Sequence, residues 1–315
     1  MDRRIRGAAL ACLLLTAGLA TGCTTESRAE SSSSATPDAS ASAKQAGRGE
    51  AGARAGTEPD ARAATAAAYR KWGLQPLAAP PAPPATKPSP KAAKDGGVPV
   101  ISEIPTKQKI VFLTFDDGAE KDPKFVTMMR ELKIPFTMFL TDAAIRADYG
   151  YFKPLQHFGD GVQNHTLTHP NLRTLGASAQ KQEICGQQTK LKAEYGTTPR
   201  LLRPPYGNWN EDTRAAAASC GLEAIVLWRE SMQITNMQYQ RGDKKLHPGD
   251  IILAHFRGPS ELKGTTMTEM TANLLRHIQE QGFDRLDRDH FRELLRGRPK
   301  VVALTHCSNV TGVVH

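Results

Sequence analysis

The sequence predicts an α/β fold in which parallel strands form a sheet that is closed or nearly closed. Short apolar runs rich in β-branched and aromatic residues alternate with longer segments of helical character over roughly 200 of the 315 residues, the lower end of what a barrel of strands and helices requires. Several of these runs also stop abruptly at polar or charged side chains. In parallel sheets, functional groups gather at the carboxyl ends of the strands.

The first expected strand is 110–115, within the sequence KIVFLTFDDG. Its unbroken apolar composition is typical of a strand that is buried on both faces. Asp116 and Asp117 follow directly, so both carboxylates are expected where the strand leaves the core. The alternative is that Asp117 and Gly118 form only a turn, because Asp-Gly is a strong turn signal.

The remaining elements follow from apolar periodicity and from start and stop signals. Asp122 and Pro123 are expected as the N-cap and first turn of one helix, while Gly221 and Gly282 end two later ones. Helices are expected at 122–132, 144–157, 178–195, 212–220, 267–281 and 290–296. Strands are expected at 110–115, 136–140, 201–202, 224–228 and 250–255, and the segment 161–164 leads to the next candidate site.

The N-terminal residues 1–22 have the composition of an export signal. A basic start precedes an apolar stretch that is shorter than the ~20 residues of a membrane-spanning helix. The sequence LATGC that follows resembles a bacterial lipobox, in which Cys23 becomes the lipidated first residue. We therefore expect a lipoprotein at the extracellular face of the bacterial cell membrane, or a secreted protein if the signal is cleaved without lipidation.

Residues 23–98 are rich in Ser, Ala, Gly and Pro and poor in large apolar side chains. Such a segment buries too little apolar surface to offset its ordering entropy, so a disordered, lipid-anchored tether with a semi-extended Pro-rich end is expected. Within it, 61–72 is expected to form a short helix. The folded domain is expected at 99–299 and a loosely packed tail at 300–315.

The formal net charge is +9, but no basic run with interleaved aromatic residues marks a nucleic-acid surface. We expect no nucleic-acid partner, and the charge indicates a soluble surface that is weakly attracted to the cell wall. Export places the remaining cysteines in an oxidising compartment. Cys185 and Cys220 lie in consecutive helical stretches and are expected to form the disulfide, which leaves Cys307 unpaired.

His165 and His169, in the sequence NHTLTHP, are the first candidate metal ligands. On a helical turn, this spacing places both imidazoles on one face, where they can share a metal ion. The neighbouring Asn164, Thr166 and Thr168 indicate a polar loop rather than a core face, although an isolated HxxxH pair is often structural. Two histidines and one carboxylate would leave a zinc ion with an open position for water.

Three further apolar runs end in side chains that carry chemistry. Arg203 and Tyr206 stand at the rigid Pro-Pro turn of LLRPPYG, Trp228 ends the run AIVLW, and His255 ends the run IILAH. Taken singly, Arg203 would be a surface ion pair and His255 a satisfied core histidine. Their common position at strand ends favours one shared site.

Four motifs, TFDDG (114–118), HTLTH (165–169), RPPYG (203–207) and LAH (253–255), resemble the ordered motifs of the polysaccharide deacetylases. These proteins are also called NodB-homology domains or carbohydrate esterase family 4. The resemblance implies a distorted (β/α) barrel with a divalent metal, usually Zn²⁺. It also implies an enzyme that removes N-acetyl groups from N-acetylhexosamine polymers.

By this resemblance, Asp117, His165 and His169 would bind the metal. Asp116 would be the general base that activates the attacking water, and His255 the general acid that protonates the departing amine. These roles agree with the chemistry, because amide hydrolysis needs an activated nucleophile, a stabilised oxyanion and a proton for a poor leaving group.

The resemblance assigns supporting roles to four further residues. Arg203 would hold the general base in place, and the backbone N–H of Tyr206 would help to stabilise the oxyanion. Leu253 and Trp228 would line the pocket for the acetyl methyl group.

One feature departs from the family. An Asp-Trp pair commonly follows the strand that here is 224–228, and its Asp orients the acid histidine, but 231–240 contains neither residue. Glu230 or Asp250 would be the substitutes, and the sequence does not choose between them.

The expected function is therefore deacetylation of a cell-wall glycan, either peptidoglycan or a chitin-like polymer, by a monomer anchored to the membrane through lipid. Two alternatives remain open at this point. One is an O-acetyl esterase acting on a polymer such as xylan. The other is a non-catalytic carbohydrate-binding protein, which the altered 231–240 segment favours and the complete set of acid, base and metal residues disfavours.

Overall fold

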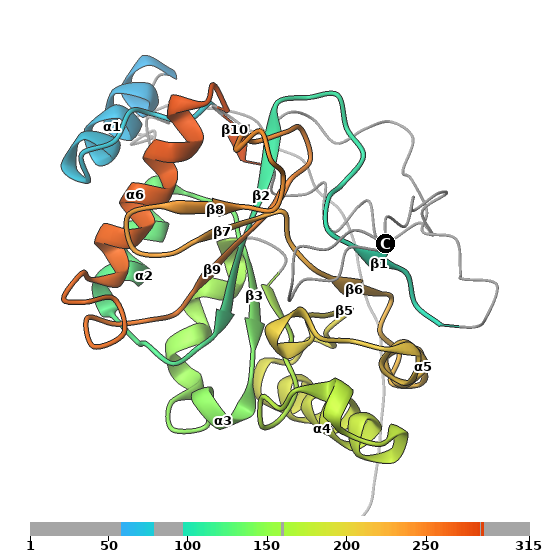
Figure 1. Cartoon of the computed structure of the whole chain (residues 1–315). Helices are drawn as coiled ribbons and strands as arrows, with labels where there is room; N and C mark the ends of the chain where they lie inside the picture. Colours follow the sequence, from blue (N-terminus) through green and yellow to red (C-terminus); the bar gives the residue numbers. More distant parts are fainter. Residues whose placement is uncertain (1–57, 79–96, 159–160, 284, 287–315) are drawn as a thin grey trace, which may run out of the picture. The chain divides into compact units, whose positions relative to one another are not determined.

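The computed structural model describes residues 58–78, 97–158, 161–283 and 285–286 (Figure 1). The described residues fall in one unit, Ala55–His315. The expected signal segment, Cys23, the helix at 290–296, Cys307 and the tail at 300–315 lie outside them.

The strands form where the sequence has short runs of β-branched, aromatic and aliphatic residues. They are β1 (Val100–Ile101), β2 (Ile110–Asp117), β3 (Thr137–Leu140), β4 (Gly161–Asn164), β5 (Leu201–Leu202), β6 (Ala224–Val226), β7 (Glu230–Met232), β8 (Met237–Tyr239), β9 (Ile251–His255) and β10 (Arg285–Leu286). The five predicted strands are confirmed with small shifts at their ends. The hairpin of β7 and β8 was not predicted.

The helices also begin and end close to their predicted signals. They are α1 (Glu58–Lys71), α2 (Pro123–Leu132), α3 (Asp142–Ile145), α4 (Ala177–Tyr195), α5 (Glu211–Ser219) and α6 (Met267–Glu280), with the 3-10 turns η1 (Tyr149–Phe152), η2 (Pro154–Phe158), η3 (Leu172–Thr174) and η4 (Pro205–Gly207). Asp122 caps α2 by accepting a hydrogen bond from the Lys124 N–H at 2.8 Å. Gly221 and Gly282 follow α5 and α6 with φ of 78° and 75°.

The long helix predicted at 144–157 is wrong. The chain there makes three short helical turns, α3, η1 and η2. The carboxylate of Asp148 accepts a hydrogen bond from the Tyr151 N–H at 3.1 Å and so starts a new turn. Pro154 has no N–H with which to continue it. Phe152 and Leu155 are buried by tertiary packing, which helical periodicity alone does not reveal.

The strands form one ten-stranded sheet in the described part of the chain, in the order β1-β6-β5-β4-β3-β2-β9-β7-β8, with β10 paired to the start of β2. All neighbours are parallel except β7 and β8. At the open edge, the Ile104 N–H donates to the Gly249 carbonyl at 2.8 Å, so the segment after β1 reaches toward the start of β9. The sheet is therefore curled and nearly closed, which confirms the predicted α/β fold.

The two faces of β2 show how the site is positioned. Ile110 and Phe112 face the barrel interior, where a core cluster is built almost entirely from strand residues. The alternate residues of β2 pack instead against α2 and α6. Toward the carboxyl end, the interior residues change from apolar to polar, to Thr114 and Asp116, which are 1% and 2% exposed. Helices cover the outside of the sheet (Figure 1).

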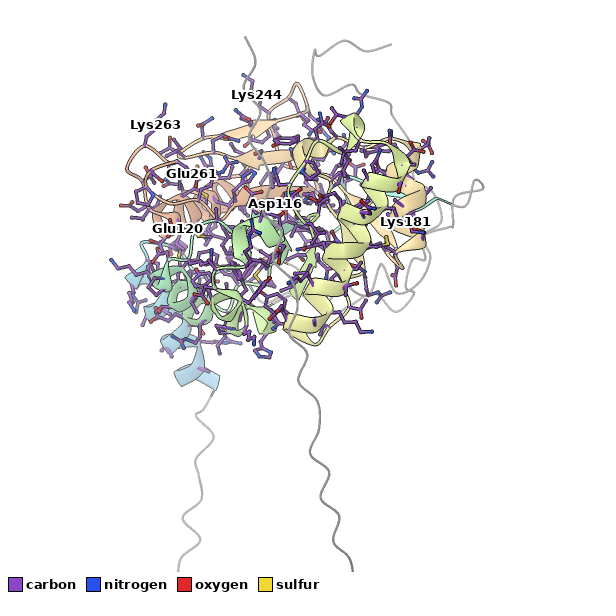
Figure 2. The ribbon with its side chains drawn as sticks, turned by 90° about the horizontal axis from the view of Figure 1, so that it is seen from below. Asp116, Glu120, Lys181, Lys244, Glu261 and Lys263 are labelled. Carbon is purple, nitrogen blue, oxygen red and sulfur yellow. A yellow bond between two sulfur atoms is a disulfide. The ribbon has the colours of Figure 1, made fainter. Side chains whose placement is uncertain are left out.

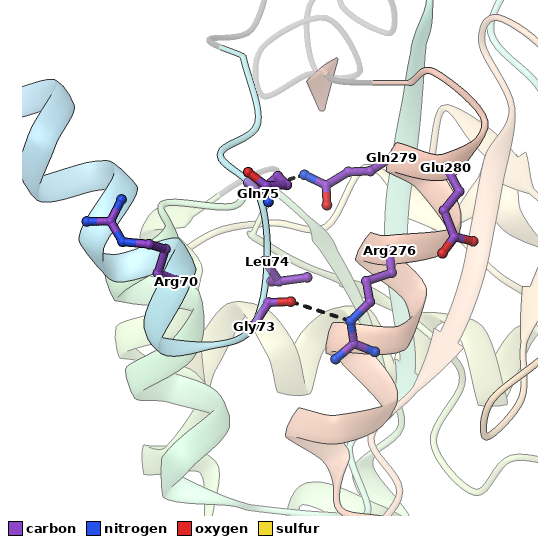
Figure 3. Close-up of a pocket in the computed structure, with 7 residues that line it drawn as sticks. All are labelled: Arg70, Gly73, Leu74, Gln75, Arg276, Gln279 and Glu280. Atoms are coloured by element: carbon purple, nitrogen blue, oxygen red, sulfur yellow. Dashed lines mark hydrogen bonds between the residues drawn. The ribbon is translucent and has the colours of Figure 1, made fainter.

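Helix α1 and the residues after it pack on the domain, although the sequence predicted a disordered tether there. The short helix expected at 61–72 is confirmed. Tyr69 and Leu74 are each 4% exposed and belong to the main core cluster. Because the segment around them has few other apolar residues, they are buried only by packing against the larger domain. The Tyr69 hydroxyl donates to the Leu132 carbonyl at 3.2 Å, and Gln279 donates to the Gln75 carbonyl at 2.6 Å (Figure 3).

These contacts involve the last residue of α2 and the last turn of α6. Both helices start near the carboxyl ends of strands and run back along the sheet, so α1 docks at the opposite end of the domain from the strand termini that carry Asp116 and His255. Figure 3 shows the pocket that forms between α6 and the segment after α1.

Cys185 of α4 and Cys220, which caps α5, form a disulfide with a Cα–Cα distance of 5.1 Å. This pairing was predicted from the order of the helices. Among the described helices, none is both long enough and apolar enough to cross a membrane.

Candidate active site

The carboxyl end of β2 directs two consecutive carboxylates toward one site. Asp116 points into the barrel, and an extended Asp117 would point to the opposite face. Asp117 instead has φ of 73°, in the left-handed region that non-glycine residues seldom adopt. The following Gly118 is closely covered, because a Cβ there would lie 2.4 Å from Ile145. The Asp-Gly turn is real, and its consequence is that both carboxylates face His165.

The HTLTH segment after β4 is an irregular loop, so the predicted helical turn is wrong. Thr166 and His169 have φ of 67° and 60°. The Asn164 side chain accepts a hydrogen bond from the Thr166 N–H at 2.9 Å, and Glu183 of α4 accepts from the Thr168 N–H at 2.9 Å. These side-chain contacts, rather than helical hydrogen bonds, bring the two imidazoles within 4.9 Å of one another, measured between ring centroids.

Asp117, His165 and His169 converge on one point. The Nε2 atoms of His165 and His169 lie 3.3 and 3.2 Å from Oδ1 of Asp117, and the three ligand atoms lie within 4.8 Å of one another. Nδ1 of His165 is 2.7 Å from the carbonyl of Arg203, which assigns an N–H to Nδ1 and directs Nε2 toward the carboxylate. Two imidazoles and one carboxylate arranged in this way fit a divalent metal ion.

The electrostatics of this group follow from burial and close pairing. Burial alone would raise the pKa of Asp117, but the hydrogen bonds from His165 and His169 lower it well below its usual range. For His165, burial acts to lower the pKa, and the charges of Asp116 and Asp117 more than compensate and raise it. The three groups thus favour an ionised carboxylate in contact with positive charge, which a bound cation also supplies.

Arg203 is fully buried, with 0% of the residue exposed, and it holds Asp116 in place. Its Nη1 donates to Oδ1 of Asp116 at 2.7 Å and to the Thr114 hydroxyl at 2.6 Å. Its Nε donates to the Val226 carbonyl at 3.0 Å and its Nη2 to the Leu227 carbonyl at 3.2 Å. Burial lowers the pKa of Arg203 despite the opposing charge of Asp116. The surface ion pair considered from sequence is therefore excluded, and Arg203 fixes one carboxylate oxygen of Asp116.

His255 lies at the end of β9, directly beside Asp116 in the register of the two strands. Its burial lowers the pKa to about 4, although Asp116 and Asp117 act in the opposite direction. From the sequence, His255 taken singly could have been a core histidine with all its hydrogen bonds satisfied. The structure instead places His255 at the same strand ends as the candidate metal ligands.

Neither substitute for the missing Asp-Trp pair reaches His255. Asp250 lies directly before β9. It is five positions from His255, which corresponds to ~16 Å along an extended strand. Glu230 pairs with Ile252, and its buried carboxyl lies beside Asp250, where burial and that neighbour raise its pKa to about 9. Arg241 donates to both oxygens of Asp250 at 2.7 and 2.9 Å. The two acids belong to a separate network at the start of β9.

Tyr206 and Trp228 stand on either side of the Pro-Pro turn. Tyr206 has φ of 62°, is 62% exposed, and its ring centroid lies 4.9 Å from that of His169. A Cβ at Gly207 would lie 3.0 Å from the Trp228 ring, so the turn packs directly against this half-buried indole. Leu253 is buried in β9, in register with Thr114. Arg203, Tyr206 and Trp228 therefore lie just beyond strand ends, whereas Leu253 lies within β9.

Two residues at the site were missed by sequence reasoning. Thr114 shares the Nη1 group of Arg203 with Asp116. Arg257, two residues beyond His255, places Nη2 3.9 Å from Oδ2 of Asp117. The signal for Arg257 was its charge directly after a strand end. Among the described non-glycine residues, seven have positive φ, and four of these lie at the site: Asp117, Thr166, His169 and Tyr206.

Comparison with known proteins gives the family. The sequence profile described as "Polysaccharide deacetylase" matches residues 103–225. An uncharacterised protein of Streptomyces coelicolor is 45% identical over 185 residues, which cover 58% of this chain and 73% of that protein. The chain belongs to the polysaccharide deacetylase family. This membership confirms the family and enzyme class, a deacetylase hydrolase, that the four motifs predicted.

Named relatives in the polysaccharide deacetylase family are more distant. A chitooligosaccharide deacetylase of Sinorhizobium fredii is 30% identical over 36% of this chain and 55% of its own length. A peptidoglycan-N-acetylmuramic acid deacetylase of Bacillus subtilis is 27% identical over 48% of this chain and 61% of its own length. A solved peptidoglycan N-acetylglucosamine deacetylase superimposes with a TM-score of 0.52 at 21% identity, over 67% of this chain and 100% of that chain, which confirms the fold.

Proposed function

We propose that this polysaccharide deacetylase is metal-dependent and removes N-acetyl groups from N-acetylhexosamine residues of a cell-wall polysaccharide, with peptidoglycan as the favoured polymer. One observation carries the proposal: Asp116, held by Arg203 through one oxygen, turns its other oxygen toward the group formed by Asp117, His165 and His169. The activities printed for the relatives, on chitooligosaccharide and on peptidoglycan, support the same substrate class.

Asp117, His165 and His169 would hold the metal, for which Zn²⁺ is proposed because of the two imidazole ligands. When bound, such an ion polarises the acetamide carbonyl and lowers the pKa of the attacking water. Nδ1 of His165 donates to the Arg203 carbonyl and thereby keeps the His165 ring oriented toward Asp117.

Asp116 accepts the proton of the attacking water at Oδ2. Its Oδ1 is engaged by Arg203 at 2.7 Å, so only the second oxygen is available, and that oxygen lies 3.8 Å from Nε2 of His165. A guanidinium that is itself fixed by two backbone carbonyls keeps this carboxylate in a single orientation.

His255 donates a proton to the amine nitrogen as the carbon–nitrogen bond breaks. Its position beside Asp116 in the strand register supports transfer of the proton from Asp116, the general base, to His255, the general acid. Tyr206 is the second residue of η4, where a backbone N–H has no partner within the turn, which supports a role for this N–H at the carbonyl oxygen. Trp228 and Leu253 are proposed to border the acetyl methyl group.

We further propose that Cys23 is lipidated and that the protein acts at the extracellular face of the cell membrane. The docking of α1 supports this arrangement, because the chain leaves the domain at the end opposite the site. The site would then face away from the membrane.

The test is acetate release by the full-length protein, supplied with zinc, from N-acetylglucosamine oligomers, purified peptidoglycan and acetylated xylan. Release from the first two, and its loss in Asp116→Asn, supports the proposal. Asp212→Asn, an exposed position in the first turn of α5, is the matched control and should retain activity. Release from xylan alone would establish the esterase alternative. Sugar binding without acetate release from any polymer would establish a carbohydrate-binding protein.

A further inference from the structure

The segment after β9 is held rigidly on both sides of Arg257. The Phe256 N–H donates to the Asp116 carbonyl at 3.0 Å, and the Glu120 N–H donates to the Phe256 carbonyl at 2.9 Å. Phe256 itself is fully buried. Gly258 lies directly under Glu120, because a Cβ there would come within 1.7 Å of a carboxylate oxygen of Glu120. The backbone of Arg257 is therefore fixed relative to the end of β2.

The guanidinium of Arg257 is at the site but makes only loose contacts. Its Nη2 lies 3.9 Å from Oδ2 of Asp117, and its Nε lies 3.8 Å from Oε1 of Glu261. Both distances exceed the 2.7–3.2 Å typical of N–H···O hydrogen bonds. Within the described residues, no side-chain hydrogen bond of Arg257 is found, and its side chain is 35% exposed.

Arg203 shows how an arginine that holds another side chain in place is bound in this protein. It is 0% exposed and its guanidinium donates four hydrogen bonds. Arg257 has the same fork of donors and lies beside Asp117, the next residue after Asp116, but its donors are too far from their neighbours to form hydrogen bonds.

Neither neighbour competes strongly for these donors. Asp117 is engaged through Oδ1 by both histidines and cannot turn to meet Arg257 without losing them. Glu261 is 49% exposed, and an exposed ion pair at this spacing contributes little free energy. Figure 2 looks onto this face, with Asp116 near its middle and Glu120 and Glu261 to one side. A carboxylate on a ligand can therefore take the guanidinium in a bidentate contact.

We propose that Arg257 is a specificity residue that binds a carboxylate on the substrate sugar and so directs the enzyme to N-acetylmuramic acid residues. The inference rests on the proposed function and narrows its substrate. N-acetylmuramic acid carries a lactyl carboxylate on the oxygen at C3, next to the C2 acetamido group, whereas N-acetylglucosamine has a hydroxyl there. An acetamide bound beside Asp117 places the C3 substituent within reach of Arg257, whose Nη2 is 3.9 Å from that residue.

The experiment uses glycan strands of peptidoglycan from which the stem peptides have been removed, so that both sugars occur in one polymer and the lactyl carboxylates are free. After treatment with the full-length protein and zinc, the ratio of muramic acid to glucosamine formed is measured by mass spectrometry. Because the two sugars compete within one substrate, this ratio reports the ratio of their kcat/KM values.

The parent protein is expected to deacetylate muramic acid residues preferentially. Arg257→Ala should lower the muramic-to-glucosamine ratio about 10- to 100-fold, the effect of losing a charge-assisted bidentate contact. Arg257→Lys, which keeps the charge but loses the fork, should give an intermediate ratio. Arg130→Ala, an exposed arginine of α2, is the charge-matched control and should leave the ratio at the parent value.

Three results would overturn the inference. An equal loss on both sugars in Arg257→Ala would show that Arg257 only positions Asp117. If the unmodified protein deacetylates only the glucosamine residues, the proposed specificity for N-acetylmuramic acid is wrong, while the proposed function stands. If no acetate is released at all, the proposed function fails. The inference is then decided by the affinity of the full-length Asp116→Asn protein for N-acetylmuramic acid over N-acetylglucosamine, and an equal affinity for the two sugars overturns it.

Discussion

Replacing Arg203 by lysine tests the central support of the site. A lysine ammonium can retain the contact with Asp116 and Thr114, because both accept from the same Nη1 group at 2.7 and 2.6 Å. It cannot also reach the carbonyls of Val226 and Leu227, which accept from Nε and Nη2. The buried carbonyl of Val226 and the part-buried carbonyl of Leu227 therefore lose their side-chain donor.

The expected cost is large. Each carbonyl left unsatisfied costs about 1–3 kcal/mol. The guanidinium carbon also lies 4.2 Å from the Phe139 ring centroid, a stacked contact that contributes about 0.5–2 kcal/mol. The free energy of unfolding of Arg203→Lys should thus fall by about 2.5–8 kcal/mol, or roughly 5–30 °C in Tm for a domain of this size. Loss of a fixed Asp116 orientation should lower kcat by about 100-fold.

The assay combines urea denaturation with acetate release, on protein with and without zinc. Arg200→Lys is the matched control, because Arg200 stands three residues earlier, is 33% exposed and pairs with Glu223 at the surface. It should cost less than about 1 kcal/mol and leave kcat at the parent value. Equal free energies of unfolding for Arg203→Lys and Arg200→Lys would refute the argument that buried carbonyls depend on the guanidinium fork.

Three further predictions follow from burial, titration and metal binding. Tyr69→Ala should lower the free energy of unfolding by about 3–5 kcal/mol in the full-length protein, and an unchanged urea midpoint would contradict the docking of α1. Glu230 has its pKa raised from 4.5 to about 9, so the folded state holds more protons than the unfolded state and stability should fall as pH rises between these values. Glu230→Gln should flatten this fall, whereas the control Glu261→Gln should not. Parallel curves of Tm against pH for Glu230→Gln and the unmodified protein would refute the assignment. His169→Ala should weaken zinc binding at least about 100-fold in competition with a chelator, whereas His157→Ala, at an exposed position, should not, and retained affinity would remove His169 from the ligand set.

The segment that replaces the Asp-Trp pair has a consequence for pH dependence. In the structure, β7 and β8 form a hairpin beside β9, and the buried acids of this region pair with Arg241 instead of with His255. Although Asp116 and Asp117 act in the opposite direction, burial lowers the pKa of His255 to about 4. Restoring a carboxylate at Gln233, the position next to His255 if the register of β7 and β9 continues, should raise that pKa.

The sequence by itself determined the elements and the residue types of the site. Short apolar runs rich in β-branched and aromatic residues, such as 110–115, are typical of buried strands, and Asp122 with Pro123 starts a helix through contacts within a few residues. The order of the motifs then indicated which side chains share a site. These signals are local, so a linear reading detects them.

Only the tertiary structure decided how those side chains meet. The positive φ of Asp117, the loop that carries His165 and His169, and the loose contacts of Arg257 depend on packing against residues far away in the chain. The same holds for α1, whose few apolar residues are buried only because α2 and α6 offer a surface for them. Contacts of this kind depend on which segments lie side by side in space, and local periodicity in the sequence does not predict them.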